Sequence, residues 1–132
     1  MDTSVWVDFL RGDPSPQAAA LEELLAGDMA VGIAPIILQE ILQGADSRTR
    51  FDRWRRYFDG LWCYVPAHPV ETHVAAARLY QSCRRAGKTP RSSNDCLIAQ
   101  IAIENDLILL HDDRDFESIA SAAPRLRLYP VS

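Results

Sequence analysis

The sequence predicts an α/β fold, a three-layer α/β/α arrangement in which helices cover both faces of a mostly parallel central sheet. Short apolar runs alternate with helical segments along the 132 residues, and this alternation requires crossover connections between parallel strands. The run 107–110 is apolar at every position, as expected of a strand buried on both faces. The length suits one hydrophobic core, and no repeat or linker divides the chain. We therefore expect a single domain over residues 1–132.

The first half of the chain should contain four helices and two strands. Residues 4–10 form a short helix that ends at Gly12, and residues 16–26 form a second helix between its cap, Ser15, and its stop, Gly27. The remaining elements are a strand over 30–33, a helix over 35–42 that ends at Gly44, a helix over 47–58 stopped by Gly60, and a weaker strand over 62–65.

The second half should contain two longer helices and two strands. Apolar residues recur at helical spacing in both long segments, and the second has an almost wholly apolar interior. The expected elements are a helix over 70–86 ended by Gly87, a helix over 94–105 with Ser93 or Asn94 as its cap, the strand over 107–110, and an edge strand over 126–129.

Composition excludes several classes of protein. Hydrophobic residues make up 48% of the chain and charged residues 24%, which is ordinary for a globular protein and excludes a disordered one. No run approaches the roughly 20 apolar residues that span a bilayer, and an acid follows Met1 directly, so we expect a cytoplasmic protein without membrane association. Cys63, Cys83 and Cys96 lack metal-site spacing and should be reduced packing residues.

The charged residues are segregated along the chain. The net charge of −4 and the pI of about 5.3 argue at first against a nucleic-acid substrate. One basic run lies in 48–56, and both a solvated helix face and phosphate contact stay open for it. The second run contains a glycine and a proline, which indicates an exposed loop ahead of a helix, where arginine suits phosphate recognition. Its basic members are Arg84, Arg85, Lys88 and Arg91.

Four acids stand at places where a carboxylate is unexpected or functionally suggestive. Glu40 lies in a helix that is apolar on nearly every side, where an unpaired charge is expensive to bury. Asp95 stands at the head of an apolar helix, and capping is an equally good explanation for it. Asp113 follows the strand 107–110, where open α/β sheets place their sites, although helix capping by Asp112, Asp113 or Asp115 stays open. Asp2, taken alone, reads as a helix cap.

A divalent cation would explain why these acids are together. If the sheet gathers the four carboxylates, they raise one another's pKa unless a positive charge neutralises them. Oxygen ligands without a His or Cys partner favour Mg²⁺ or Mn²⁺ over zinc or copper. Such a centre suits the hydrolysis of a phosphodiester, and one ion or two would serve.

Four motifs, taken in order, resemble those of VapC toxins, which are PIN-domain ribonucleases. They are Asp2-Thr-Ser-Val-Trp-Val-Asp-Phe-Leu-Arg-Gly12, Leu-Gln-Glu40-Ile-Leu-Gln-Gly, Arg91-Ser-Ser-Asn-Asp-Cys-Leu-Ile-Ala99 and His111-Asp-Asp-Arg-Asp-Phe116. The resemblance runs from Asp2 to the last expected strand. Family members usually carry a few apolar residues before the first acid. Here only Met1 precedes Asp2, so we expect weaker anchoring of Asp2.

The resemblance implies roles for individual residues. Asp2, Glu40, Asp95 and Asp113 would form the catalytic metal site, with Asp115 as a fifth possible ligand and Mg²⁺ or Mn²⁺ as the cofactor. The residues expected to face the RNA backbone, or an inhibiting segment of antitoxin, are Thr3, Ser4, Arg84, Arg85, Lys88 and Arg91. The family further implies a VapB-type antitoxin, a toxin homodimer, and a heterotetramer or larger complex of the two. Six aromatic residues fit a groove or a dimer face as well as a core: Trp6, Phe9, Trp54, Tyr57, Phe58 and Trp62.

The sequence leaves other functions open. A housekeeping PIN-domain nuclease, acting in RNA processing or on structured DNA, would use the same carboxylates. A catalytically silent module that binds RNA or a protein would use the arginines alone. Metal-free RNA cleavage by histidine is a third alternative, since His68, His73 and His111 are present. Of these, His111 adjoins an acidic motif.

Overall fold

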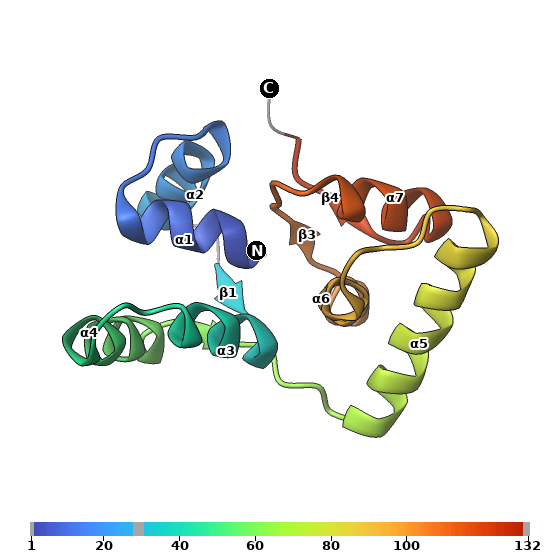
Figure 1. Cartoon of the computed structure of the whole chain (residues 1–132), viewed down its shortest axis with the longest axis horizontal. Coiled ribbons are helices and arrows are strands. Elements are labelled where there is room, and N and C mark those ends of the chain that lie inside the picture. The colour runs from blue at the N-terminus through green and yellow to red at the C-terminus, as the bar shows by residue number, and fades with distance from the viewer. Residues whose placement is uncertain (1, 28–30, 131–132) are drawn as a thin grey trace. The chain divides into compact units, whose positions relative to one another are not determined.

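The computed structural model describes residues 2–27 and 31–130, which form two compact units, each with its own helices and parallel strand pair (Figure 1). The first unit extends to Val65 and the second from Pro66 to Pro130. The parallel strands confirm the expected strand direction, while the single domain over residues 1–132 stays a prediction. No helix in the described ranges is long and apolar enough to cross a membrane.

The first unit contains four helices and a two-stranded parallel sheet. Its elements are α1 (Thr3–Arg11), α2 (Pro16–Ala26), β1 (Gly32–Ile33), α3 (Pro35–Gln43), α4 (Arg48–Asp59) and β2 (Trp62–Cys63). Helix α1 packs against α2 and α3, and α3 packs against α4. Gly32 pairs with Trp62 and Ile33 with Cys63. The helix bounds agree with expectation within a residue or two. Of the expected strand 30–33, residues 32–33 form β1, residue 31 lies outside the strand, and residue 30 lies outside the described ranges.

Helix ends in this unit follow the capping residues of the sequence. The Ser15 hydroxyl accepts a hydrogen bond from Ala18 N at 2.9 Å, with a proline in the first turn of α2. Helix α1 ends at Gly12, whose φ of 73° is a left-handed conformation that other residues rarely adopt. Gly32 serves close packing instead: an added Cβ would lie 2.2 Å from Tyr64 Cε2.

Aromatic residues form much of the core of the first unit. Trp6 is 0% exposed and packs edge to face on Phe58, with ring centroids 5.0 Å apart. Trp54 and Phe58 are also buried, so these three are core residues. Trp62, by contrast, is 69% exposed. The aromatic set is therefore divided between core and surface.

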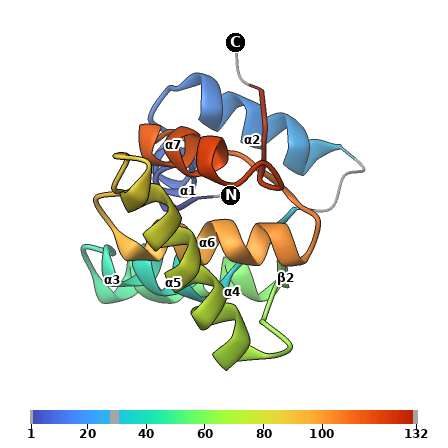
Figure 2. The same ribbon diagram turned by 90° about the vertical axis from the view of Figure 1, so that its right-hand side faces the viewer.

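The second unit contains three helices and a second parallel pair of strands. Its elements are α5 (Pro69–Arg85), α6 (Ser93–Glu104), β3 (Ile108–Leu109), α7 (Arg114–Ala122) and β4 (Arg127–Leu128). Helix α5 packs against both α6 and α7, as Figure 2 also shows for α5 and α6. Ile108 pairs with Arg127 and Leu109 with Leu128, which confirms the strand expected near the C-terminus.

Two details of the second unit differ from expectation. The cap of α6 is Ser92, not Ser93 or Asn94, because the Ser92 hydroxyl accepts from Asn94 N at 3.2 Å. The strand 107–110 is not buried on both faces: Leu109 and Leu110 are buried, but Ile108 is 46% exposed. Alternate side chains of a strand point to the same face, so Ile108 shares a face with the buried Leu110, and that face is uncovered only at Ile108.

The cysteines are reduced, as expected, and two of them lie together in the core. Cys83 on α5 and Cys96 on α6 are 0% and 1% exposed, and their side chains share a hydrogen bond. Burial is the main cause that raises the pKa of Cys83 and raises that of Cys96 to about 12, from an ordinary value of 9.0.

These raised pKa values predict a loss of stability in alkaline solution. The folded state favours the protonated thiols, so their contribution is complete below the unfolded pKa near 9.0 and is lost as pH rises from there towards 12. The urea midpoint should fall between about pH 8 and pH 10.5, and should fall less in a Cys83→Ala, Cys96→Ala double variant. An identical pH dependence in the two proteins would contradict this assignment.

Candidate metal centre

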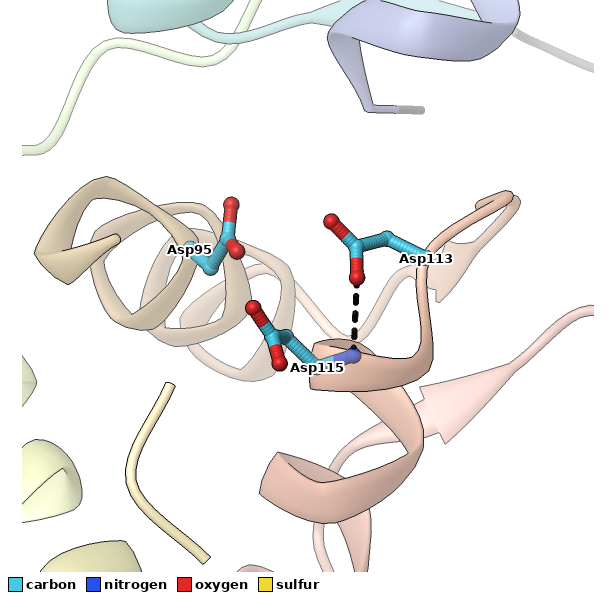
Figure 3. A group of neighbouring side chains, drawn as sticks. All are labelled: Asp95, Asp113 and Asp115. Atoms are coloured by element: carbon cyan, nitrogen blue, oxygen red, sulfur yellow. Dashed lines mark hydrogen bonds between the residues drawn. The ribbon is translucent and has the colours of Figure 1, made fainter. Parts of the chain in front are cut away.

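Three carboxylates converge at the N-terminal ends of α6 and α7. Asp95 lies in the first turn of α6, Asp113 is the N-cap of α7, and Asp115 lies in its first turn. One oxygen from each lies within 4.8 Å of the other two, and the three side chains point towards one another in Figure 3. All three are half-buried. The acids of two of the predicted motifs thus meet inside one unit.

Helix termini explain how the chain places these acids. The strand β3 delivers the chain to Asp113, whose Oδ1 accepts from Asp115 N at 2.9 Å and so begins α7. The unpaired N–H groups of a helix N-terminus carry partial positive charge. Two such termini meet here, and their dipoles attract negative charge. The capping explanation for Asp113 is therefore confirmed, and it is compatible with a second role.

Arg91 joins two of the three acids. Its Nη2 donates to Asp113 Oδ1 at 2.9 Å, while its Nε and backbone N donate to Asp115 Oδ2 at 3.2 and 3.1 Å. The hydrogen bonds to Asp115 and then to Asp113 raise the pKa of Arg91. The guanidinium side chain is 77% exposed. Arg91 therefore pairs with two of the three acids of this cluster.

The donor set fits a divalent cation that prefers oxygen. Among the described residues, the cluster consists of three carboxylates and includes no imidazole or thiolate. Mg²⁺ and Mn²⁺ favour such oxygen ligands. The oxygens are close enough to approach one ion together. Such an ion would bring positive charge to the place where the three carboxylates converge.

The other predicted acids lie in the first unit. Asp2 caps α1, because its Oδ1 accepts hydrogen bonds from Val5 N at 3.3 Å and from the Ser4 hydroxyl at 3.2 Å. Asp2 is buried, with 5% of its surface exposed. Thr3 Oγ1 donates to Glu40 Oε1 at 2.7 Å, which joins α1 to α3. Glu40 is half-buried. The structure therefore brings Asp2, Thr3, Ser4 and Glu40 into one pair of helices.

Comparison with known proteins identifies the family. The sequence profile of the PIN domain matches residues 1–122. The VapC ribonuclease Mb1587 of Mycobacterium bovis is 38% identical over 124 residues, which cover 91% of this chain and 90% of the relative. The chain belongs to the VapC-type PIN-domain family. Ribonuclease VapC11 of Mycobacterium tuberculosis matches this PIN domain with the same identity and coverage.

A solved structure supports the fold class of the PIN domain. The crystal structure of VapBC2 from Rickettsia felis, bound to a DNA fragment from their promoter, matches with a TM-score of 0.74. The match covers 97% of this chain and 94% of that chain, at 22% identity. This likeness confirms the expected α/β PIN fold.

The basic residues predicted to face RNA differ in their surroundings. Arg91 is the cation of the PIN-domain acidic cluster, a contact that local sequence did not indicate. Lys88 Nζ donates to the Ser121 hydroxyl of α7 at 3.0 Å, and Arg85 contacts Ser82 at 3.5 Å. Arg84 is exposed in the last turn of α5. In the described part of the chain, Arg91 forms the ion pairs with Asp113 and Asp115, and the other three basic residues form none with these acids.

His111 supports the acidic loop. Its Nδ1 accepts a hydrogen bond from Asp113 N at 3.2 Å, and its ring lies 5.6 Å from that of Phe116. An Nδ1 that accepts from a backbone N–H carries no proton, so the Nε2–H tautomer fits this contact. His68 and His73 are exposed at the start of α5, as expected. This arrangement favours a positioning role for His111.

The Thr3–Glu40 contact makes a testable contribution to stability. Thr3→Val removes the donor and leaves a half-buried carboxylate oxygen unpaired, so we expect it to lower the free energy of unfolding by about 1–3 kcal/mol. Thr3→Ser keeps the hydroxyl and should cost clearly less. Urea denaturation measures both variants, and equal losses would show that the methyl group matters, not the hydrogen bond.

Proposed function

We propose that this chain is the ribonuclease toxin of a VapBC toxin–antitoxin pair and that it hydrolyses RNA phosphodiester bonds with Mg²⁺ or Mn²⁺. The observation that carries the proposal is the convergence of Asp95, Asp113 and Asp115 within 4.8 Å. The 38% identical relatives are VapC ribonucleases, which supports the substrate class. The Rickettsia felis protein of similar fold is a VapBC2, which supports an antitoxin partner.

The proposed metal ligands are Asp95, Asp113 and Asp115, with Asp2 and Glu40 contributing to the same reaction. When bound, the ion supplies positive charge that stabilises the developing charge of the phosphodiester and makes water a stronger nucleophile. Arg91 keeps an exposed guanidinium beside the ligands and would attract the phosphate of an approaching strand. Asp113 also caps α7 by accepting a hydrogen bond from Asp115 N, and this contact positions Asp115.

In this proposal Glu40 accepts a proton and Thr3 positions it. The Thr3 hydroxyl fixes Glu40 through Oε1. Within the described part of the chain, Oε2 has no hydrogen-bond donor, so it is the atom proposed to take up a proton from water. A carboxylate held in this way loses little conformational freedom when it accepts that proton.

The decisive experiment is cleavage of a structured RNA by the purified chain, with Mg²⁺ or Mn²⁺ and with EDTA. Asp95→Asn keeps the size of the side chain and removes one charge, and should lower the cleavage rate at least about a hundredfold, the upper range for disturbed metal sites. The matched control is Asp52→Asn on the exposed side of α4. Cleavage that survives both EDTA and Asp95→Asn would refute the carboxylate mechanism.

Growth separates a toxin from the alternatives. Expression of the wild-type chain should arrest growth, and co-expression of the neighbouring small reading frame or the Asp95→Asn change should relieve the arrest. A housekeeping nuclease would cut RNA without arresting growth, and a silent binding module would be unaffected by Asp95→Asn. Light scattering on the purified proteins tests the proposed homodimer and its heterotetramer or larger complex with the antitoxin.

A further inference from the structure

The second unit contains a pocket that the acidic cluster does not use. It is formed by α5, α6 and the connection from α7 to β4, with a volume of about 340 Å³. Apolar residues such as Leu79 and Ile103 contribute to its lining, together with Ser82 and Gln100. Two arginines, Arg78 from α5 and Arg125 from the connection, also line it.

The charges of these two arginines are not neutralised locally. Both residues are exposed, and neither guanidinium forms an ion pair with a described carboxylate. By contrast, Arg50, Arg55, Arg91 and Arg127 each pair with an aspartate. In a chain with a net charge of −4, two unpaired arginines in one pocket form a local site for an anion.

The nearby acid, Glu104, hydrogen-bonds to neutral side chains of the two helices. Gln100 donates to Glu104 Oε1 at 3.2 Å, and the Thr72 hydroxyl donates to Glu104 Oε2 at 2.8 Å. The carboxylate of Glu104 is thus engaged within α5 and α6. The pocket keeps two guanidinium groups available for a ligand.

A row of cations connects this pocket with the acidic cluster. Arg78, Ser82 and Arg85 lie at positions i, i+4 and i+7 of α5, and hence on one face of the helix. The Arg85 guanidinium contacts Ser82, and Lys88 contacts Ser121 of α7. Arg91 then reaches Asp113 and Asp115. Cations therefore follow one another from the pocket along α5 to the candidate metal ligands.

We infer that the Arg78–Arg125 pocket binds a backbone phosphate of the RNA strand, away from the phosphodiester that is cut. The inference rests on the proposed function and adds a second anchoring point to it. Arginine binds phosphate oxygens bidentately, and a row of cations suits the regular spacing of phosphates. A peptide that adds to the protein as a β-strand would need free backbone partners, whereas α5 and α6 use theirs within the helices.

The test measures binding of a fluorescent single-stranded RNA of about 12 nucleotides to the full chain in EDTA, by anisotropy. The double variant Arg78→Ala, Arg125→Ala should weaken binding and reduce the slope of log K against log salt by about 0.7, which is the contribution of one phosphate contact on a single strand. Between about 50 and 200 mM salt, the wild type should lose about 2.6-fold more affinity than this variant. The control is Arg127→Ala, which removes one positive charge, from an arginine paired with Asp106; the single variants Arg78→Ala and Arg125→Ala match it in charge.

Three outcomes separate the possibilities. A reduced slope in the double variant, with the control unchanged and the urea midpoint of all proteins equal, supports the pocket whether or not the chain cleaves RNA. An unchanged slope in a chain that does cleave RNA overturns the pocket and leaves the nuclease intact. Loss of polyglutamate binding with RNA affinity retained would assign the pocket to an acidic peptide, and would also overturn the inference.

Discussion

Asp113→Asn should lower RNA cleavage at least about a hundredfold and leave the fold intact. The side chain of Asp113 caps α7 through Asp115 N and also belongs to the acidic cluster. Asparagine caps a helix as well as aspartate does, so the hydrogen bond survives the change. The charge does not, and the cluster loses one of three carboxylates that would bind a cation. Cleavage rates and urea denaturation, measured on the same preparations, separate the two roles.

Two neighbouring variants sharpen this result. Asp112→Asn changes an exposed acid next in sequence that lies outside the cluster, and should keep full activity. Asp113→Ala removes both the cap and the charge, so it should lose the activity and about 0.5–2 kcal/mol of stability. If Asp113→Asn retained activity while Asp113→Ala lost it, the cap alone would explain the residue.

Trp6→Ala should lower the free energy of unfolding by about 3–5 kcal/mol, the range for removing a buried large aromatic residue. Trp6 is 0% exposed and lies edge to face with Phe58 at 5.0 Å, with Tyr57 at 6.3 Å and with Phe9 at 6.1 Å. Alanine would leave a cavity among these rings. Urea denaturation followed by circular dichroism gives the change directly.

Trp6→Phe is the matched variant for this position. The buried indole N–H of Trp6 has no hydrogen-bond acceptor among the described residues, so its removal relieves the desolvation penalty of an unpaired donor. Phenylalanine also keeps the edge-to-face contacts. We expect Trp6→Phe to cost less than about 1.5 kcal/mol. A loss equal to that of Trp6→Ala would indicate that the indole N–H has a partner in solution.

The helices were predictable from this sequence because capping residues and glycines close to each end determine where a helix begins and ends. Ser15 and Gly27 bracket α2, and Ser47 caps α4 through Arg50 N at 3.1 Å. Strands were less predictable because a short apolar run does not reveal which of its faces will be covered. Ile108 is as apolar as its leucine neighbours, yet nearly half of its surface is exposed.

The candidate site was predictable in part for the same reason. Each acid was visible as a carboxylate at an element end or in an apolar helix, and the order of the four motifs resembled one family. The contacts between distant segments were not visible. Arg91 pairs with Asp115 across 24 residues and with Asp113 across 22, and Thr3 reaches Glu40 across 37. Such pairs depend on tertiary packing, which no local pattern encodes.

In the proposed toxin, the capping role of Asp113 has a genetic consequence. Mutations that abolish toxicity are selected whenever the chain is expressed without an inhibitor, and most routes to inactivity also unfold the protein. At position 113, asparagine, serine and threonine retain a capping oxygen. Survivors carrying these residues should accumulate full-length protein, whereas survivors with apolar residues should contain less of it. Among survivors with a substitution at position 113, the amount of full-length protein should therefore depend on whether the new residue can cap α7.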